Sequence, residues 1–570
     1  MKNLIKKALE ILTKKDKINC ILAAFFLIIK SILEVLGIGL IIPILNFITN
    51  QNNNFIYDYF PSLEKIGNHK LIILLVFIFI VIYLLKTLFV IFYHVWVSKF
   101  VNNLSVSLTR RVLEKYLNKN YLFFLENNPS FLVRNITGET SIFASILIGG
   151  LIMSFTQIVF IFSVCLFLVI YNFYTFYVII FLAFICGMIV KITNNKFKKW
   201  GDVRQNKSAL ILKRINEIVG SIKEVILYNK RNFFAEEFNM HNKKLAEANI
   251  YRDTSLSFTG PIIEFIGILI FFCFFLFLMI YSTHSLGEIT VLFGVFAFAS
   301  IKLLPAAISI SRTLQSMKFN LPACGVVYEI LLGSDDGYRI SQDEKSIKNP
   351  LNQIKFENVS FFYKNQKYPT LDKINFEINV GDKIGIIGET GAGKTTLLNI
   401  IATLVEPTFG KIIINNSNQL EPQKEIRNNI GYVPQSVYLS DDTILSNITL
   451  SKDTSKEEEE EILKILKPLN LSHINNKPID IFTPIGEKGS ILSGGQIQRI
   501  GIARALFRKP GILILDEATN ALDDKNEKQI LDYLFEKFSN KVIILCTHKK
   551  ELLKYCNKIL EIKDNSIRLK

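Results

Sequence analysis

The stretch Leu492-Ser493-Gly494-Gly495-Gln496 decides how the C-terminal half of this chain folds. It lies between the glycine-rich loop Gly388-Glu389-Thr390-Gly391-Ala392-Gly393-Lys394-Thr395 and an apolar run that ends in Asp516-Glu517. The loop follows an apolar strand and opens a helix at Thr396, which is the context that a phosphate-binding loop requires. Glycines there let backbone N–H groups surround phosphates at a helix N-terminus. The order of these motifs predicts a nucleotide-binding α/β domain.

Several side chains of these motifs have the chemistry to bind ATP and Mg²⁺. Lys394 can reach the β- and γ-phosphates, and the hydroxyl of Thr395 can ligate Mg²⁺. Asp516 ends a hydrophobic strand, which is where an enzyme with a phosphate-binding loop holds its Mg²⁺. Ser493 begins a further helix, and a helix N-terminus is suited to an anion. We therefore expect a nucleotide and Mg²⁺ as cofactors.

Together the three motifs resemble those of the ATP-binding cassette (ABC) family. The resemblance implies that Glu517 is the general base that polarises the attacking water, and a carboxylate beside the γ-phosphate suits that role. It also implies that the signature, residues 492–496, faces ATP held by the opposite subunit. Because the chain contains one phosphate-binding loop and one signature, each site needs two chains. We therefore expect a homodimer with two competent sites.

Three weaker matches belong to the same site. The resemblance assigns Gln435 to sensing Mg²⁺ and contacting the membrane domain, His548 to contacting the γ-phosphate, and Tyr363 to stacking on adenine. The predicted catalytic residues are Glu517, His548 and Gln435, and the predicted metal-binding residues are Thr395, Gln435 and Asp516. The predicted ATP-binding residues are Tyr363, Gly388, Glu389, Thr390, Gly391, Ala392, Gly393, Lys394, Thr395, Thr396, Ser493, Gly494, Gly495 and Gln496.

The chain departs from the family's pattern in three places. The loop after the acid pair begins with Asn520, where the family usually has Ser. Pro484 stands where exporters often carry Glu, and Lys549-Lys550 follow His548 in place of the usual Arg-Leu. None of these positions is expected to touch the phosphate chemistry, but all bear on the contacts that the family makes between subunits.

The composition of the whole chain indicates a membrane protein. Half of its 570 residues are hydrophobic, 46 are Phe, and the formal net charge is +16. This positive charge is typical of a protein that binds nucleic acid or of a membrane protein with the positive-inside bias. The basic residues lie between apolar segments, which favours the membrane protein. We therefore expect no nucleic-acid partner. The seven scattered cysteines predict neither a disulfide framework nor a zinc site. Six segments approach the ~20 residues of a membrane-spanning helix, namely 18–48, 71–97, 142–170, 173–192, 262–283 and 287–312.

The basic residues predict how the chain lies in the membrane. The connections 98–141 and 193–260 are rich in Lys and Arg, whereas the other three connections are short and nearly free of them. The positive-inside rule therefore predicts that both termini, the two basic connections and the ATPase domain lie in the cytoplasm. The resemblance to cassette transporters implies that the membrane is a bacterial inner membrane. Residues 1–17 mix apolar and basic side chains, which predicts an amphipathic helix on the membrane surface.

These features predict a fold of two parts. Residues 1–334 form a six-helix α-helical transmembrane domain of the ABC exporter type, 335–350 a linker, and 351–570 an α/β P-loop NTPase domain. In the exporters that the chain resembles, the spans continue into the cytoplasm and end in short transverse helices that press on the ATPase domains. Residues 128–132 and 225–229 are candidates for these helices, and ordinary loop helices are the alternative.

Ionisable residues within the spans are candidates for contact with a transported substrate, because each costs roughly 2.5–3.5 kcal/mol at the membrane centre. Lys30 and Glu34 are four residues apart and could pair, while Glu264 could neutralise Lys86 or Lys302. If these side chains instead line a central cavity, two subunits supply several cations there. Such a cavity suits an anionic headgroup, such as a phosphate or pyrophosphate.

Residues 32–45 of the first span, the stretch Lys302-Leu303-Leu304-Pro305 of the sixth and the spacing of Lys86 loosely resemble bacterial flippases for lipid-linked oligosaccharides. In those proteins a short amphipathic helix lies outside the membrane between the first two spans, and residues 55–63 could form it. We therefore expect ATP-driven export or flipping of an amphipathic lipid-linked substrate, a polyprenyl-pyrophosphate-linked oligosaccharide, by a protein surrounded by membrane lipids. The alternatives are a general lipid, multidrug or peptide exporter, a soluble cassette ATPase that works on nucleic acid, and an ATP-gated channel.

Overall fold

The computed structural model describes residues 2–39, 68–171, 173, 175–281, 286–333, 352–364, 366–415, 422–471, 473–474, 477–478 and 480–570. By their contacts, these residues form two compact units. The first unit contains the described residues up to 119 and from 123 to 333, and the second contains 120–122 and the residues from 352 onward. The predicted linker 335–350, the end of the first predicted span and the predicted outer helix at 55–63 lie outside the described residues.

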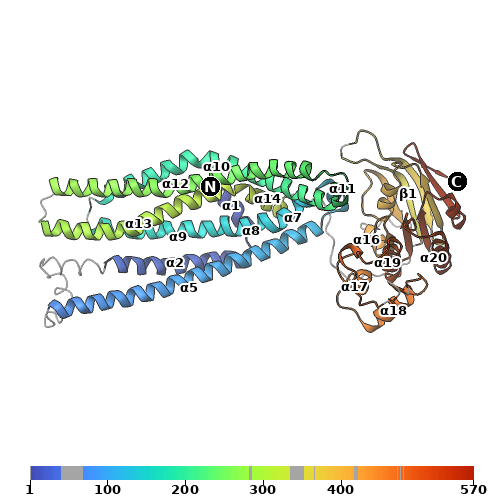
Figure 1. The fold of residues 1–570 in the computed structure, drawn as a ribbon, viewed down its shortest axis with the longest axis horizontal. Helices are drawn as coiled ribbons and strands as arrows, with labels where there is room; N and C mark the ends of the chain where they lie inside the picture. The colour runs from blue at the N-terminus through green and yellow to red at the C-terminus, as the bar shows by residue number, and fades with distance from the viewer. Residues whose placement is uncertain are drawn as a thin grey trace. The chain divides into compact units, whose positions relative to one another are not determined.

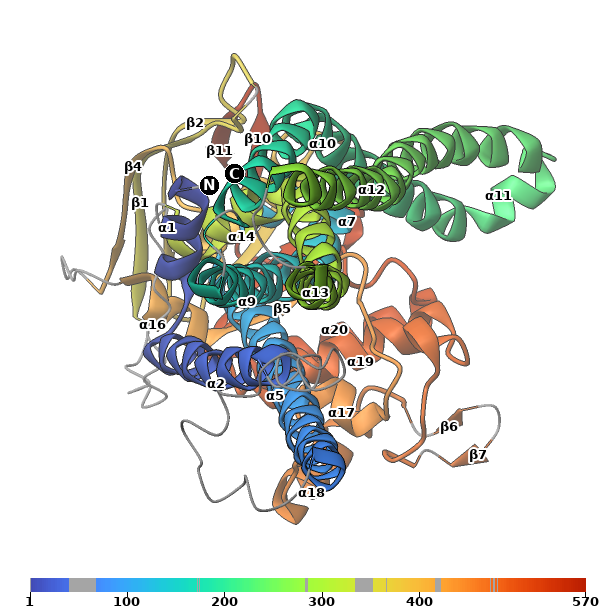
Figure 2. The same cartoon turned by 90° about the vertical axis from the view of Figure 1, so that its left-hand side faces the viewer.

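The first unit is helical (Figure 1). Five stretches of its described residues are long and apolar enough to cross a membrane. They lie in α2 (Lys14–Gly39), α5 (Asn68–Leu117), the run from α7 (Pro129–Arg134) to α9 (Gly149–Tyr171), α12 (Arg231–Tyr281) and α13 (Leu286–Phe319). The predicted span 173–192 falls at the start of the helix α10 (Thr175–Gly220). Figure 2 shows these long helices nearly end-on, gathered into one bundle.

Three helices continue far beyond the length that a membrane requires. α5 has 50 residues, α10 has 46 and α12 has 51, whereas a span needs about 20. The polar connections predicted from the sequence are therefore mostly helical extensions of the spans. Short helices join these extensions: α6 (Tyr121–Glu126) and α7 follow α5, and α11 (Ile222–Leu227) lies between α10 and α12. The two candidate transverse segments overlap α7 and α11.

The N-terminal helix α1 (Lys2–Ile11) packs on protein. Ala8, Ile11 and Leu12 are buried in a cluster that includes residues of α5 and of α14 (Leu321–Leu332). Lys7 Nζ lies 4.6 Å from the centre of the Tyr328 ring, and Arg111 Nη1 donates to the Ile11 carbonyl at 2.9 Å. The sequence predicts that this apolar face meets the membrane surface, and the structure differs because α14 and α5 cover it.

The segment between α7 and α9 contains a buried charge cluster. Here the helix widens into two π-helical stretches, η2 (Asn135–Glu139) and η3 (Phe143–Ile148), on either side of α8 (Thr140–Ile142). The Glu139 side chain is 1% exposed and lies 3.3 Å from Arg204 Nη2 and 3.7 Å from Arg134 Nε. Two guanidinium groups therefore neutralise one buried carboxylate, and they connect η2 to α10.

The second unit is built on two main sheets. An antiparallel sheet has the order β2-β1-β4, with β1 (Gln353–Phe361), β2 (Leu371–Asn379) and β4 (Phe409–Ile414). The larger sheet has the order β11-β10-β3-β9-β8-β5, and all its strands are parallel except β11. Its strands are β3 (Lys383–Gly388), β5 (Ile430–Val433), β8 (Ile512–Asp516), β9 (Val542–Cys546), β10 (Lys558–Lys563) and β11 (Ser566–Leu569).

The remaining elements of this unit are helices and one short strand pair. They are α15 (Lys394–Ile401), α16 (Pro422–Asn429), α17 (Ile444–Thr449), α18 (Lys456–Leu466), the strand pair β6 (His473–Ile474) and β7 (Lys477–Pro478), η4 (Glu487–Gly489), α19 (Gly494–Phe507), α20 (Asp524–Lys537) and η5 (Lys550–Tyr555). Two buried apolar clusters fill the unit. The predicted fold class, a helical transmembrane part followed by an α/β P-loop domain, is confirmed.

Candidate functional site

The phosphate-binding loop joins β3 to α15. Gly391 and Gly393 have φ angles of 84° and 101°, a region that favours glycine. A Cβ atom on Gly393 would also approach Leu371 to 3.1 Å. No side chain caps α15, whose N-cap is Gly393. The first-turn N–H groups of α15 are therefore available to an anion, and the loop fits a nucleotide phosphate.

Lys394 lies folded over this loop. Its Nζ donates to the carbonyls of Gly388 at 2.8 Å and Glu389 at 3.3 Å, and the residue is 7% exposed. These carbonyls hold the ammonium group beside the loop's N–H groups. A phosphate bound to the N–H groups therefore has a positive charge next to it.

The carboxyl ends of β3, β5, β8 and β9 meet at one edge of the sheet, because these strands are parallel. Glu517 follows β8 there with φ of 49°, an uncommon angle for a residue other than glycine. Its carboxylate accepts from Gln435 Nε2 at 2.9 Å and Asn520 Nδ2 at 3.0 Å, and lies 2.8 Å from His548 Nε2. Three side chains therefore surround this carboxylate, and two of them, Gln435 and His548, are distant from it in the sequence.

His548 has two neighbours for a single nitrogen. Its Nε2 lies 2.8 Å from Glu517 Oε1 and 3.3 Å from Lys394 Nζ. A neutral imidazole nitrogen either donates or accepts a hydrogen bond, so Nε2 cannot serve both partners. The shorter distance and the acceptor character of the carboxylate favour a proton on Nε2 that is donated to Glu517.

Asp516 is the last residue of β8 and is 6% exposed. Tyr432 on β5 donates its hydroxyl to Asp516 Oδ2 at 3.0 Å. Burial raises the pKa of the Asp516 carboxyl, and the hydrogen bond from Tyr432 acts in the opposite direction. Burial, followed by the nearby Asp516 charge, also raises the pKa of Tyr432. The tyrosine is therefore a neutral hydrogen-bond donor.

Asp516 and Thr395 supply oxygen atoms of the kind that Mg²⁺ prefers. Within the described residues, no group of three or more His, Cys, Asp or Glu side chains gathers as a metal site. Mg²⁺ commonly takes one or two protein ligands and completes its coordination with phosphate oxygens and water. The available oxygen donors therefore fit a metal ion that binds together with the nucleotide.

Tyr363 follows β1 and lies near the start of α15. Its hydroxyl is 3.1 Å from Thr396 Oγ1, and its ring packs edge-to-face on Phe361 with centroids 4.9 Å apart. The structure therefore brings Tyr363 to the helix that begins with the phosphate-binding loop. Its stacking on adenine remains a prediction.

The signature begins α19. Ser493 is the N-cap and accepts from the Gln496 N–H, while Gln496 Oε1 accepts from the Ser493 N–H at 2.8 Å. A Cβ atom added to Gly494 would lie 3.6 Å from the Cβ of Ala521, and one added to Gly495 would lie 3.2 Å from the Ala521 carbonyl oxygen. The signature glycines therefore lie against the loop that follows Glu517.

Comparison with known proteins agrees with this geometry. Residues 371–520 match the family described as ABC transporter, and residues 20–303 match the ABC transporter transmembrane region. The chain belongs to the ABC transporter family. An ABC transporter binds ATP and couples its hydrolysis to transport, so this protein is an ATP-hydrolysing, multi-pass membrane transporter.

Relatives and a solved structure resemble this transporter over most of its length. The ATP-dependent lipid A-core flippase of Blochmanniella floridana is 27% identical over 97% of this chain and 91% of its own. The flippase of the same name from Yersinia pestis (strain Antiqua) is 25% identical over 97% of this chain and 92% of its own. That of Photorhabdus laumondii is 26% identical over 83% of this chain and 80% of its own. A bacterial Atm1-family ABC exporter solved with ATP bound has the same fold, with a TM-score of 0.77, 19% identity and coverage of 98% of this chain and 94% of its own.

Two of the transporter's departures from the family pattern lie beside the site. Asn520 contacts the Glu517 carboxylate, so the prediction that these positions stay away from the phosphate chemistry is wrong for Asn520. The backbone explains this contact, because the Asn520 N–H donates to the Glu517 carbonyl in a turn that brings both side chains together. Lys549 instead pairs with the buried Glu527 of α20 at 2.7 Å.

The ionisable residues of the transporter's spans are paired differently from the simplest prediction. Glu34 forms its ion pair with Lys86 of α5, not with Lys30 four residues away. Lys30 Nζ lies 5.6 Å from the Tyr93 ring centre, while Lys86 and Lys302 lie 4.4 Å and 5.6 Å from that of Tyr83. The structure therefore brings Glu34, Lys86 and Lys302 around one tyrosine.

Glu264 is the remaining candidate in the spans. It is exposed on α12, and none of the ion pairs among the described residues includes it. Glu264 is therefore not part of the group around Tyr83 in this structure.

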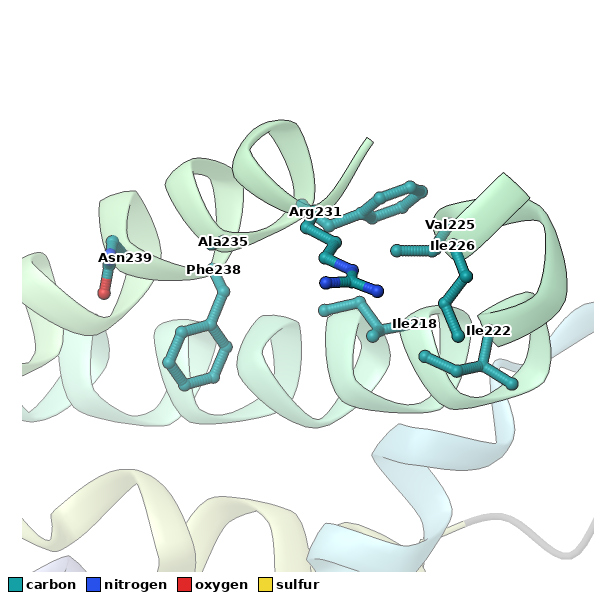
Figure 3. A pocket seen from close by; sticks show the side chains of 9 residues that line it. Ile218, Ile222, Val225, Ile226, Arg231, Ala235, Phe238 and Asn239 are labelled. Carbon is teal, nitrogen blue, oxygen red and sulfur yellow. The ribbon is translucent and has the colours of Figure 1, made fainter. Parts of the chain in front are cut away.

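An open pocket of about 480 Å³ lies where α10, α11 and α12 meet. Figure 3 shows Ile218, Ile222 and Ile226 on one side of it, with the Arg231 guanidinium pointing inward. Next to this pocket, Leu227 and Tyr228 are 79% and 70% exposed. Within the first unit, the end of this helical hairpin therefore carries exposed apolar side chains.

Proposed function

We propose that this transporter flips an amphipathic glycolipid with an anionic headgroup outward across the bacterial inner membrane. The observation that carries this proposal is the excess of lysine within the apolar helices. Lys30, Lys86 and Lys302 stand against the single paired carboxylate of Glu34. An uncompensated charge at membrane depth is expensive and marks a functional position. Lysines there attract a phosphate or pyrophosphate.

The substrate class rests on two further points. The relatives are named lipid A-core flippases, which supports a lipid carrying sugars. The resemblance of the first span to flippases for lipid-linked oligosaccharides supports a polyprenyl-pyrophosphate-linked oligosaccharide. Lipid A-core and a polyprenyl-pyrophosphate-linked oligosaccharide are therefore both candidate substrates. A general lipid, multidrug or peptide exporter on the same scaffold is the alternative.

ATPase measurements in proteoliposomes test the substrate. We expect lipid-linked oligosaccharide or lipid A-core to stimulate ATP hydrolysis by the wild-type protein. Lys302→Gln removes a positive charge that is not in the Glu34 pair, so stimulation should need about tenfold more glycolipid, equal to ~1.4 kcal/mol of binding free energy. Lys243→Gln, on the exposed cytoplasmic part of α12, is the matched control and should behave as wild type.

The same assay separates the alternative. Strong stimulation by hydrophobic drugs, with no response to either glycolipid, would contradict the flippase proposal and favour a multidrug exporter. If the glycolipid stimulates wild type and Lys302→Gln equally, the proposed substrate class stands, but Lys302 does not belong to the substrate-binding site.

Within the ATP site, we propose roles that follow the geometry. Asp516 and Thr395, with Gln435 nearby, would hold Mg²⁺, which neutralises phosphate charge when bound. Lys394 stabilises the β- and γ-phosphates, and Glu517 orients and polarises the attacking water. His548, whose Nε2 proton points to Glu517, lies between this carboxylate and Lys394, where it can contact the γ-phosphate.

The working unit that we propose is a homodimer with its ATPase units in the cytoplasm. The chain has one phosphate-binding loop and one signature, and the signature begins α19 with Ser493 as its N-cap, which supports a role toward ATP held by a second copy. Leu227, the last residue of α11, and Tyr228, which follows it, are exposed and support a further contact with that copy. The basic extensions of α5, α10 and α12 support the cytoplasmic orientation through the positive-inside rule.

A further inference from the structure

Asp516 is held by side chains from both neighbouring strands. β8 lies between β5 and β9 in the sheet, with Tyr432 paired in register with Ile514 and Cys546 with Asp516 itself. The Tyr432 hydroxyl donates to Asp516 Oδ2 at 3.0 Å from one side. On the other side, Cys546 lies in register with Asp516, so its thiol stands beside this carboxylate and acts on it as a weak donor.

The same two strands also lead to the residues that surround Glu517. Gln435 follows Tyr432 by three residues and donates to Glu517 at 2.9 Å. His548 follows Cys546 by two residues and lies 2.8 Å from Glu517. Each neighbouring strand therefore places one hydrogen-bond donor on Asp516 and, further along, one on Glu517.

Burial makes the contacts of Asp516 important. Asp516 is 6% exposed, Cys546 is fully buried, and Tyr432 packs against the apolar core. A buried carboxylate without hydrogen-bond donors is strongly destabilised, and its orientation is then free to change. Donors from two sides fix the plane of the carboxylate. Side chains that orient a metal ligand in this way change metal affinity without touching the metal.

We propose that Tyr432 and Cys546 are positioning residues that orient the Asp516 carboxylate for the metal ion of the nucleotide. They thereby determine how much Mg²⁺ adds to nucleotide affinity. Tyr432 has the larger effect, because a phenol is a stronger donor than a thiol. This inference rests on the proposed role of Asp516 in holding Mg²⁺, and neither residue touches the nucleotide or the metal.

Binding of the non-hydrolysable analogue AMP-PNP to the full-length protein, with Mg²⁺ and with EDTA, tests the inference. Tyr432→Phe removes only the hydroxyl, so affinity in EDTA should remain that of wild type. The gain in affinity on adding Mg²⁺ should fall by about tenfold, the lower end of the usual effect of losing such a partner. Electron paramagnetic resonance of Mn²⁺ should show a matching loss of metal affinity in the AMP-PNP complex.

Matched variants complete the test. Tyr438→Phe makes the same change six residues later, at an exposed tyrosine, and should match wild type under both conditions. Cys546→Val replaces the thiol by two methyl groups, which keeps the site apolar but removes the weak donor, so its Mg²⁺-dependent gain should fall in the same direction by less. Cys546→Val also decides the test if Tyr432→Phe fails to fold.

The possible outcomes are distinct. An unchanged Mg²⁺-dependent gain in Tyr432→Phe overturns the inference, as does an equal loss of affinity with Mg²⁺ and with EDTA. If Tyr432→Phe does not fold, an unchanged gain in Cys546→Val overturns it. A wild-type protein whose AMP-PNP affinity ignores Mg²⁺ contradicts the proposed metal role of Asp516 itself, which is a separate failure.

Discussion

At the residue scale, Glu517 carries the sharpest prediction. Replacing it with Gln keeps a side chain that can still meet Gln435 and Asn520 but removes the proton acceptor. We expect ATP hydrolysis to fall by about 10²–10⁴-fold, the usual contribution of a general base, while ATP binding persists. Steady-state ATPase and nucleotide-binding measurements check this, with Glu536→Gln on the exposed face of α20 as the control. Full hydrolysis and transport by Glu517→Gln would show that another residue is the general base.

Sequence motifs identified two of the three side chains around Glu517, missing Asn520, and neither of the residues that hold Asp516. Gln435 and His548 stand in short recognisable motifs, and the structure brings both to Glu517. Tyr432 and Cys546 sit in apolar strands, where either residue is equally suited to plain core packing. Their partner lies 84 and 30 residues away, and only the strand order β9-β8-β5 brings them to it. A one-dimensional pattern does not contain that order.

At the element scale, the buried Glu139 is predicted to hold η2 to α10. Glu139→Ala would leave Arg134 and Arg204 buried without their shared carboxylate, and breaking such a cluster typically costs about 3–5 kcal/mol. We expect a clear drop in the thermal unfolding temperature of the detergent-solubilised protein. Glu114→Ala breaks the exposed pair with Arg110, where about 0.3–0.5 kcal/mol is usual for this spacing. Similar losses in both variants would refute a structural role for the buried cluster.

Hydropathy located the spans but not the lengths of the helices. An apolar run reports where lipid surrounds the chain, whereas helical hydrogen bonding continues into polar sequence. α5, α10 and α12 therefore extend through connections that the sequence marks only as basic. The sequence also did not predict the ion pair of Glu34. Lys30 is the nearest charge in the sequence, but Glu34 pairs with Lys86 on a neighbouring helix.

At the scale of the whole molecule, shared ATP sites predict complementation between two inactive chains. Lys394→Ala disables the phosphate-binding loop, and Ser493→Arg disables the signature. In a mixed dimer, the intact loop of one chain meets the intact signature of the other, so one site of two should recover. We expect each variant alone to be inactive and the co-expressed pair, purified with two different tags, to regain up to about half of the wild-type ATPase rate, as independent sites would allow.

The contrary result is equally clear. If each chain formed its ATP site alone, the mixed dimer would contain two defective sites and stay inactive. Lys394→Ala mixed with wild type shows how much activity a single functional site supports, and it serves as the reference.

The packing of α1 on α14 has a consequence for how the protein is made. α14 begins about 310 residues after α1 ends, which corresponds to roughly 15–60 s of translation at ~5–20 residues per second. During that interval Ala8, Ile11 and Leu12 have no α14 to cover them. The membrane surface, where the sequence alone would place this amphipathic helix, is a suitable holding site. Synthesis of α1 therefore long precedes that of α14, its final packing partner.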